Sequence, residues 1–135
     1  MDDKILYEKA KEIFYNIPFV NSIGIKLIDV TKNIAKAEFE VLKQYANYIG
    51  GLHGGVLSGV IDTIVFFPGA LLPSGLKLTT SGFDIKFFRP ANVGDIIKIK
   101  AEILYMGNRR INVEALAFKE SKIIAKANVD LMKIN

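Results

Sequence analysis

The sequence predicts an α+β protein in which one curved antiparallel sheet wraps around a central apolar helix. Three observations predict it: an amphipathic segment at the start, one long apolar segment without a two-residue period, and strand-like runs on both sides of that segment. The connections between the runs are short, which favours antiparallel neighbours. The chain has 135 residues, so we expect a single domain that spans 1–135.

Residues 2–16 have the spacing of an amphipathic helix. One face collects the apolar side chains, and the charged side chains lie elsewhere; the apolar face consists of Leu6, Ala10, Ile13 and Phe14. Pro18 is expected to end this helix, because proline lacks the backbone N–H that a further turn requires.

Two hairpin strands are expected next, at 25–30 and 35–41, because the second segment alternates apolar and polar residues. Lys32-Asn33 lies between them, and asparagine tolerates the left-handed conformation of a tight turn. After a turn at Pro73-Ser74-Gly75, four further strands are expected to form an antiparallel meander, at 78–88, 95–106, 109–119 and 123–132.

The apolar segment from His53 to about Leu71 is predicted to be the central helix. It is apolar on nearly all sides, which is typical of a helix surrounded by protein. Pro68-Gly69 should kink it or end it early. We do not expect it to cross a membrane, because it contains Asp62, glycines and a proline.

The composition excludes several kinds of site. There are no cysteines, so a disulfide framework, a thiolate zinc site and a cysteine nucleophile are excluded. With His53 as the one histidine, neither a metal site nor a serine triad is expected. The start, Met1-Asp2-Asp3-Lys4, is acidic where a signal peptide is basic. Together with the missing cysteines, this favours a cytoplasmic location.

The distribution of charge indicates which kinds of partner the chain can bind. The formal net charge is +4, but the basic residues are spread along the expected strands and form no run or basic helix. Nucleic acid is therefore not an expected partner. A mildly basic protein suits a small polyanionic ligand equally well.

Two features of the segment 47–62 can carry chemistry. Glycines crowd the helix start at His53-Gly54-Gly55, where free backbone N–H groups carry partial positive charge and can hold a developing oxyanion. Asp62 is a lone carboxylate in an apolar helix, a costly arrangement unless the group is paired or functional. The alternatives are that Asp62 pairs with a cation of the sheet or caps a turn, and that the glycines permit close packing.

The spacing of Gly54 and Asp62 predicts a dimer if both are catalytic. Eight residues separate them, which is about 12 Å along a helix. A catalytic group must come within about 3 Å of its reacting atom, so one chain cannot easily place both at the same carbonyl. Two antiparallel copies of the helix about a twofold axis would bring Gly54 towards the partner's Asp62.

At these residues the sequence resembles the phenylacetate-pathway branch of the hotdog-fold acyl-CoA thioesterases, in the 4-hydroxybenzoyl-CoA thioesterase superfamily. The shared pattern, in order and spacing, is Asn47, Gly50, His53-Gly54-Gly55 and Asp62. The resemblance covers nearly the whole chain. It implies hydrolysis of aryl- or aliphatic acyl-CoA to a free acid and coenzyme A, no cofactor apart from the coenzyme A of the substrate, and a homodimer or homotetramer.

The resemblance also implies a role for each site residue. The Gly54 N–H polarises the thioester carbonyl, and the partner's Asp62 acts as nucleophile or as general base on water. Asn47 orients water or the carboxylate, Thr80 holds the attacking water, and His53 fixes the loop. The alternative function is a non-catalytic acyl-CoA-binding or sensing domain on the same fold.

Arg89, Arg109 and Arg110 are candidates to hold the phosphates of coenzyme A. They are the only arginines in the chain, and a guanidinium can bind phosphate through two hydrogen bonds. Arg109 and Arg110 should not contribute equally, because adjacent strand residues face opposite ways. The family that this sequence resembles has a Gly-x-Arg pattern here, which favours Arg109 as the residue that binds phosphate. The alternative is that all three are solvated charges at strand ends.

Overall fold

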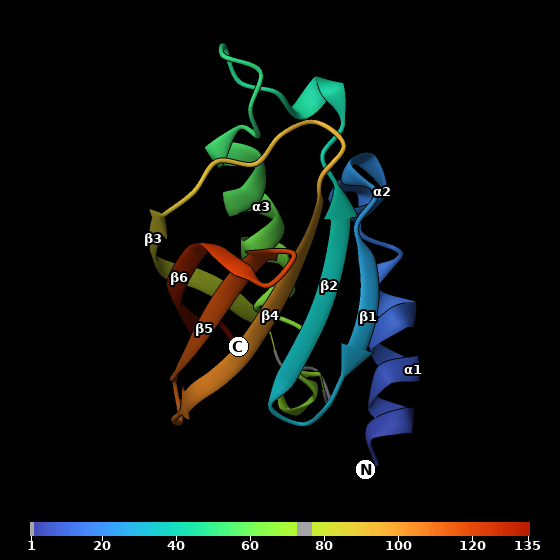
Figure 1. Cartoon of the computed structure of the whole chain (residues 1–135). Coiled ribbons are helices and arrows are strands. Elements are labelled where there is room, and N and C mark those ends of the chain that lie inside the picture. The colour runs from blue at the N-terminus through green and yellow to red at the C-terminus, as the bar shows by residue number, and fades with distance from the viewer. Residues whose placement is uncertain (1, 73–76) are drawn as a thin grey trace.

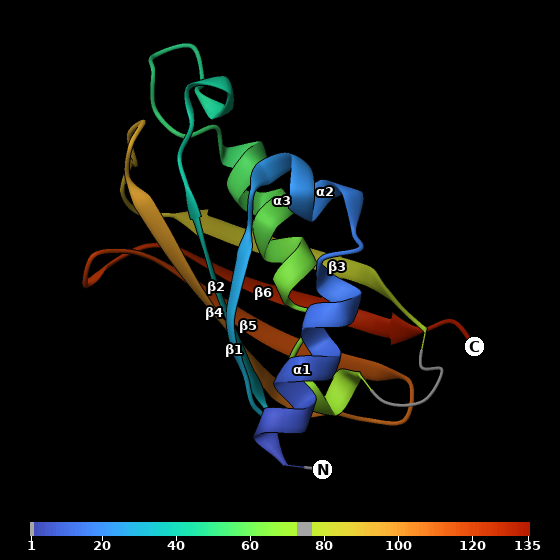
Figure 2. The same ribbon diagram turned by 90° about the vertical axis from the view of Figure 1, so that its right-hand side faces the viewer.

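The computed structural model describes residues 2–72 and 77–135. The predicted α+β architecture is confirmed: one antiparallel sheet curves around helix α3 (Gly54–Ile64), as Figures 1 and 2 show. The turn expected at Pro73-Ser74-Gly75 falls on 73–76 and lies outside the described residues. None of the described helices has the length and hydropathy that a membrane-spanning helix needs.

The amphipathic start forms α1 (Asp3–Phe14), which packs against the first strand. Asp2 caps it, because its Oδ1 accepts a hydrogen bond from the Ile5 N–H at 2.9 Å. Pro18 does not simply end a helix, as the sequence predicted, but begins the short helix α2 (Pro18–Ile23). Proline fits the first helical position because the N–H that it lacks has no partner there.

The six strands form one sheet in the order β1-β2-β4-β5-β6-β3. Their bounds match the expected runs to within about a residue: β1 Lys26–Val30, β2 Ile34–Glu40, β3 Leu78–Phe87, β4 Ile96–Met106, β5 Arg110–Lys119 and β6 Lys122–Lys133. The expected four-stranded meander is wrong in one respect, because β3 pairs with β6, and β4 pairs with β2. Alternation predicts which face of a strand is buried but does not predict its neighbour.

The inner face of the sheet makes room for α3 with small side chains. Five alanines of β4, β5 and β6 are fully buried there: Ala101, Ala115, Ala117, Ala125 and Ala127. Against this face α3 buries Leu57, Val60, Ile61 and Ile64. The other side of α3, with Ser58, Gly59 and Asp62, is only half-buried. The helix is therefore not surrounded by this one chain, contrary to the prediction.

Helix α3 is also shorter than the expected segment 53–71. It ends at Ile64, and a single turn of 3-10 helix, η2 (Gly69–Leu71), follows Pro68. The intervening Phe67 turns into the core, where its ring meets Phe14 edge-on at 5.0 Å between centroids. The apolar character of 65–71 therefore reflects burial and not a longer helix.

The turn between β5 and β6 contains a strained residue. Glu120 and Ser121 form this two-residue connection, and Glu120 has a φ of 56°. Among the described residues it is the one non-glycine residue with positive φ. A side chain in this conformation costs roughly 1–2 kcal/mol, which a glycine would avoid.

Candidate active site

Asp62 and Thr80 meet on the half-buried side of α3. The Thr80 hydroxyl, on strand β3, donates a hydrogen bond to Asp62 Oδ1 at 2.7 Å. No described lysine or arginine forms an ion pair with Asp62. The carboxylate is thus oriented by a hydroxyl on one oxygen and keeps its second oxygen available, which differs from a structural ion pair.

The carboxylate faces a shallow and mostly apolar depression. Its volume is about 220 Å³, and its lining includes Gly59 of α3 and the half-exposed ring of Phe83 on β3. The Phe19 ring packs over Gly59 so closely that an added Cβ would lie 2.9 Å from its Cζ, and the ring would have to shift. A reacting group can therefore approach Asp62 from outside this chain.

The start of α3 carries one free backbone donor. His53 caps the helix: its Nδ1 accepts from the Gly55 N–H at 2.8 Å, and its carbonyl accepts from the Val56 N–H at 3.0 Å. No described group accepts from the Gly54 N–H. This N–H lies at the positive end of the helix dipole, where an oxyanion is stabilised.

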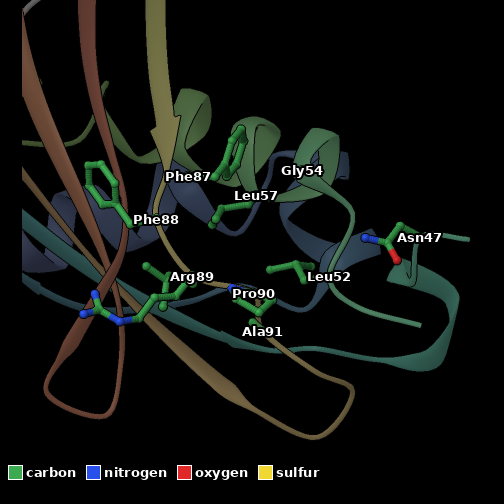
Figure 3. Close-up of a pocket in the computed structure, with 10 residues that line it drawn as sticks. Asn47, Leu52, Gly54, Leu57, Phe87, Phe88, Arg89, Pro90 and Ala91 are labelled. Carbon is green, nitrogen blue, oxygen red and sulfur yellow. The ribbon is translucent and has the colours of Figure 1, made fainter. Parts of the chain in front are cut away.

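Gly54 lines a pocket of about 320 Å³, drawn in Figure 3. In that view Phe87 and Leu57 lie beside Gly54, and Arg89 and Pro90 lie across the pocket from them. The Phe87 ring covers the helix start so closely that a Cβ added to Gly54 would lie 3.2 Å from its Cζ. The pocket therefore has a free donor at one end and walls that are mostly apolar, with Asn47 and Arg89 as the polar exceptions.

Asn47 orders the loop that precedes α3. Its Oδ1 accepts from the N–H groups of Ile49 at 3.1 Å and Gly51 at 3.0 Å. Gly50, with a φ of 85°, makes the sharp turn between them. The side chain of Asn47 also lines the pocket. One residue therefore both orders the loop and forms part of the pocket wall.

The wall opposite Gly54 is held by a second loop. The Leu52 N–H donates to the Ala91 carbonyl at 2.8 Å, which ties the two loops together. Farther along, Asp95 Oδ2 accepts from the Asn92 N–H at 2.7 Å. This hydrogen bond, assisted by Lys119, holds the pKa of the Asp95 carboxyl below its usual range. Asp95 therefore stays ionised to a lower pH than an ordinary aspartate does, and its hydrogen bond to the loop is kept there.

The predicted site residues fall into two groups in one chain. Gly54, His53, Asn47 and Arg89 gather at the start of α3, whereas Asp62 and Thr80 lie two helical turns away. Arg109 and Arg110 are exposed beside the turn between β4 and β5. The Arg109 carbonyl accepts from the Lys133 N–H at 2.9 Å, which places it near the other end of β3 from Arg89.

Two aromatic residues of this region were missed by sequence reasoning. Phe87 covers Gly54, and Phe83 borders the depression at Asp62. Phenylalanines in a strand are expected in the core, yet both are substantially exposed in this chain. The signal that could have found them is the absence of clean alternation in 78–88.

Comparisons with known proteins show the family to which the chain belongs. The family model described as the thioesterase superfamily matches residues 49–125. Acyl-coenzyme A thioesterase 13 of Mus musculus is 25% identical over 125 residues, covering 91% of this chain and 79% of that protein. The family match over 49–125 includes all of α3 and, apart from Asn47, the residues that line the pocket of Gly54.

Solved structures share the fold. The Escherichia coli PaaI protein, from the phenylacetic acid degradation operon, superposes with a TM-score of 0.87 at 23% identity over 96% of both chains. A hypothetical thioesterase protein of Streptococcus pneumoniae, solved with coenzyme A, gives a TM-score of 0.82 at 20% identity, over 92% of this chain and 96% of that one. The hotdog fold and the resemblance inferred from the sequence are confirmed.

Proposed function

The chain belongs to the thioesterase superfamily, and we propose that this thioester hydrolase acts on acyl-CoA, releasing a free acid and coenzyme A. The mouse relative is by name an acyl-coenzyme A thioesterase, and the Streptococcus pneumoniae neighbour was solved with coenzyme A. The observation that carries the proposal is the pairing, on one helix, of a free Gly54 N–H with a carboxylate oriented by Thr80.

The active site is shared between two subunits. Two copies of α3 that run antiparallel about a twofold axis bring Gly54 of one subunit towards the partner's Asp62. Two features of the single chain support this assembly: the half-buried side of α3 around Asp62, and the unpaired outer edge of β3. An unpaired edge strand is a natural site for pairing with a second chain.

In this arrangement each group has one chemical task. The Gly54 N–H stabilises the negative charge that develops on the carbonyl oxygen. The partner's Asp62 either takes a proton from the attacking water or attacks the carbonyl carbon itself. In the first case water adds to the carbonyl carbon and the C–S bond breaks. In the second case the C–S bond breaks as an anhydride forms between Asp62 and the acyl group, and water then hydrolyses that anhydride and restores the carboxylate. Both routes use one water, give the free acid, and leave the thiolate of coenzyme A to take up a proton.

Arg89 is the arginine best placed to hold a phosphate of the same substrate, because it lines the pocket of Gly54. Arg109 and Arg110 lie towards the end of α3 that carries Asp62 and not towards Gly54. They would therefore reach the substrate bound at Gly54 only from the partner subunit. Their role in binding coenzyme A stays a prediction. The same holds for assembly beyond a dimer.

A panel of aliphatic and aryl acyl-CoA thioesters, read by release of free thiol, tests the proposed function. We expect thiol release well above the uncatalysed rate for at least one chain length or aryl group. Tight binding of acyl-CoA with no release at any pH would support the alternative, a non-catalytic binding or sensing domain.

Thr80→Val should slow hydrolysis moderately. Valine keeps the shape of threonine but cannot donate to Asp62, and a hydrogen bond to a charged group contributes about 1.5–3 kcal/mol, or roughly 10- to 100-fold in kcat. Steady-state kinetics measure the effect. Thr79→Val is the matched control, because Thr79 is exposed and faces the other side of β3. A loss as severe as that of Asp62→Asn would refute this division of roles.

A further inference from the structure

The depression at Asp62 contains a second hydroxyl group, that of Ser58. Ser58 lies on α3 one turn before Asp62, and it lines the same depression as Asp62, Thr80 and Phe83. Residues four apart in a helix lie on the same face, with their Cβ atoms about 5–6 Å apart. The Ser58 hydroxyl and the Asp62 carboxylate therefore border one space from neighbouring turns of one helix.

The Ser58 hydroxyl has no hydrogen-bond partner among the described residues. A hydroxyl within a helix commonly donates to the carbonyl four residues earlier. Thr63, on the same helix, does so, because its Oγ1 donates to the Gly59 carbonyl at 2.9 Å. Ser58 makes no such bond, and its side chain is half-buried. Its hydroxyl is therefore free to accept from a small ligand in the depression and to donate to it.

The Thr80 hydroxyl, in contrast, is engaged by the carboxylate. A threonine hydroxyl has one proton, and Thr80 donates that proton to Asp62 Oδ1 at 2.7 Å. Asp62 Oδ2 accepts from no described group, so it can accept from a water molecule. A water that is held by Oδ2 alone can still swing about that one bond. Attack in a fixed direction therefore requires a second contact.

We propose that the Ser58 hydroxyl supplies this second contact and holds the water that Asp62 activates. The inference rests on the proposed function, because only hydrolysis requires such a water. One water can bridge a hydroxyl and a carboxylate whose Cβ atoms are about 5–6 Å apart. Two hydrogen bonds, one to Asp62 Oδ2 and one to Ser58 Oγ, fix the water and leave a lone pair for the carbonyl carbon at the partner's Gly54.

This arrangement assigns Asp62 the role of general base. As the water oxygen bonds to the acyl carbon, one proton of the water passes to Asp62 Oδ2. The C–S bond then breaks, and the thiolate of coenzyme A takes up the proton that Asp62 had accepted. Ser58 gains and loses no proton in this sequence, so its contribution is to hold the water in position.

The alternative role for Ser58 is a contact between subunits. Ser58 lies midway between Gly54 and Asp62 in the sequence. Two helices that place Gly54 beside the partner's Asp62 therefore cross near Ser58, where the two hydroxyls could bond to each other. Loss of such a contact would weaken the dimer, whereas loss of a hydroxyl that holds water would lower kcat in an intact dimer.

Ser58→Ala distinguishes these roles. Alanine favours helix formation, so α3 should form as before. We expect kcat to fall about tenfold, the effect of losing one hydrogen bond, with KM unchanged and with the dimer intact by light scattering on dilution. Thr63→Val is the matched control, because it removes a hydroxyl of the same helix that is bound to the backbone; its kcat should stay close to that of the natural chain. An unchanged kcat in Ser58→Ala, or a loss that follows dissociation of the dimer, would overturn the inference.

A double-mutant cycle with Asp62→Asn gives a second readout. Without the general base, a well-placed water gains little, so adding Ser58→Ala to Asp62→Asn should change kcat only slightly. A tenfold loss in both backgrounds would mean that Ser58 acts independently of Asp62, and would overturn the inference while the natural chain still hydrolyses acyl-CoA. Absence of thiol release from the natural chain would instead refute the proposed function, and the role of Ser58 with it.

Discussion

Replacing Asp62 by asparagine should lower kcat for acyl-CoA by about 10²- to 10⁴-fold or more. The amide has nearly the size of the carboxylate but can neither attack a carbonyl nor take a proton from water. Its carbonyl oxygen can still accept the hydrogen bond that Thr80 donates at 2.7 Å, so the fold should survive. Steady-state kinetics measure the loss, and thermal unfolding checks the fold.

Asp84→Asn is the matched control for that experiment. Asp84 is an exposed carboxylate of β3, the strand that carries Thr80, and it is paired loosely with Lys86 at 3.7 Å. Loss of its charge should leave kcat unchanged. A near-normal kcat in Asp62→Asn would instead assign Asp62 a structural role.

Gly54→Pro should lower kcat by about 10²- to 10³-fold, the usual effect of losing one oxyanion donor. The substitution removes the N–H that no described group accepts. Proline is favoured at the first position of a helix, and His53, with φ −66° and ψ 127°, already has the conformation that a residue before proline requires. The helix should therefore form as before, which circular dichroism can verify.

Gly54→Ala distinguishes the effect of losing the hydrogen-bond donor from the effect of adding a side chain at this position. Alanine keeps the backbone N–H, while in both variants the new Cβ lies about 3.2 Å from the Phe87 ring, which must shift slightly. We expect Gly54→Ala to retain most of the activity. If alanine were as damaging as proline, the effect would come from crowding against Phe87 and not from the lost hydrogen-bond donor.

Much of the fold could be predicted because its signals are local. Alternation in β4, β5 and β6 places Ile97, Val113 and Val129 inward, and all three are fully buried. The pairing of β3 with β6 could not be predicted, because it depends on contacts such as Thr80 with Leu131, far apart in the chain. The end of α3 at Ile64 could not be predicted, because the following residues 65–71 are as apolar as the helix itself.

The candidate site was predictable to a similar extent. The composition and the glycines identified Gly54 and Asp62 as candidates, and their spacing predicts a shared site if both are catalytic. The hydroxyl of Thr80 lies on a different element, so its bond to Asp62 is visible only in three dimensions.

The activity of mixed subunits tests most directly whether the site is shared. Asp62→Asn and Gly54→Pro chains, each nearly inactive alone, are mixed in equal amounts, unfolded and refolded together. In a shared site, each mixed dimer combines the intact Gly54 of one chain with the intact Asp62 of the other. Random pairing makes about half of the dimers mixed, and each mixed dimer has one intact site and one site that carries both substitutions. About one quarter of all sites are then intact, so activity should return to about one quarter of the natural level. Activity that stays at the average of the two separate variants would contradict a site shared between subunits.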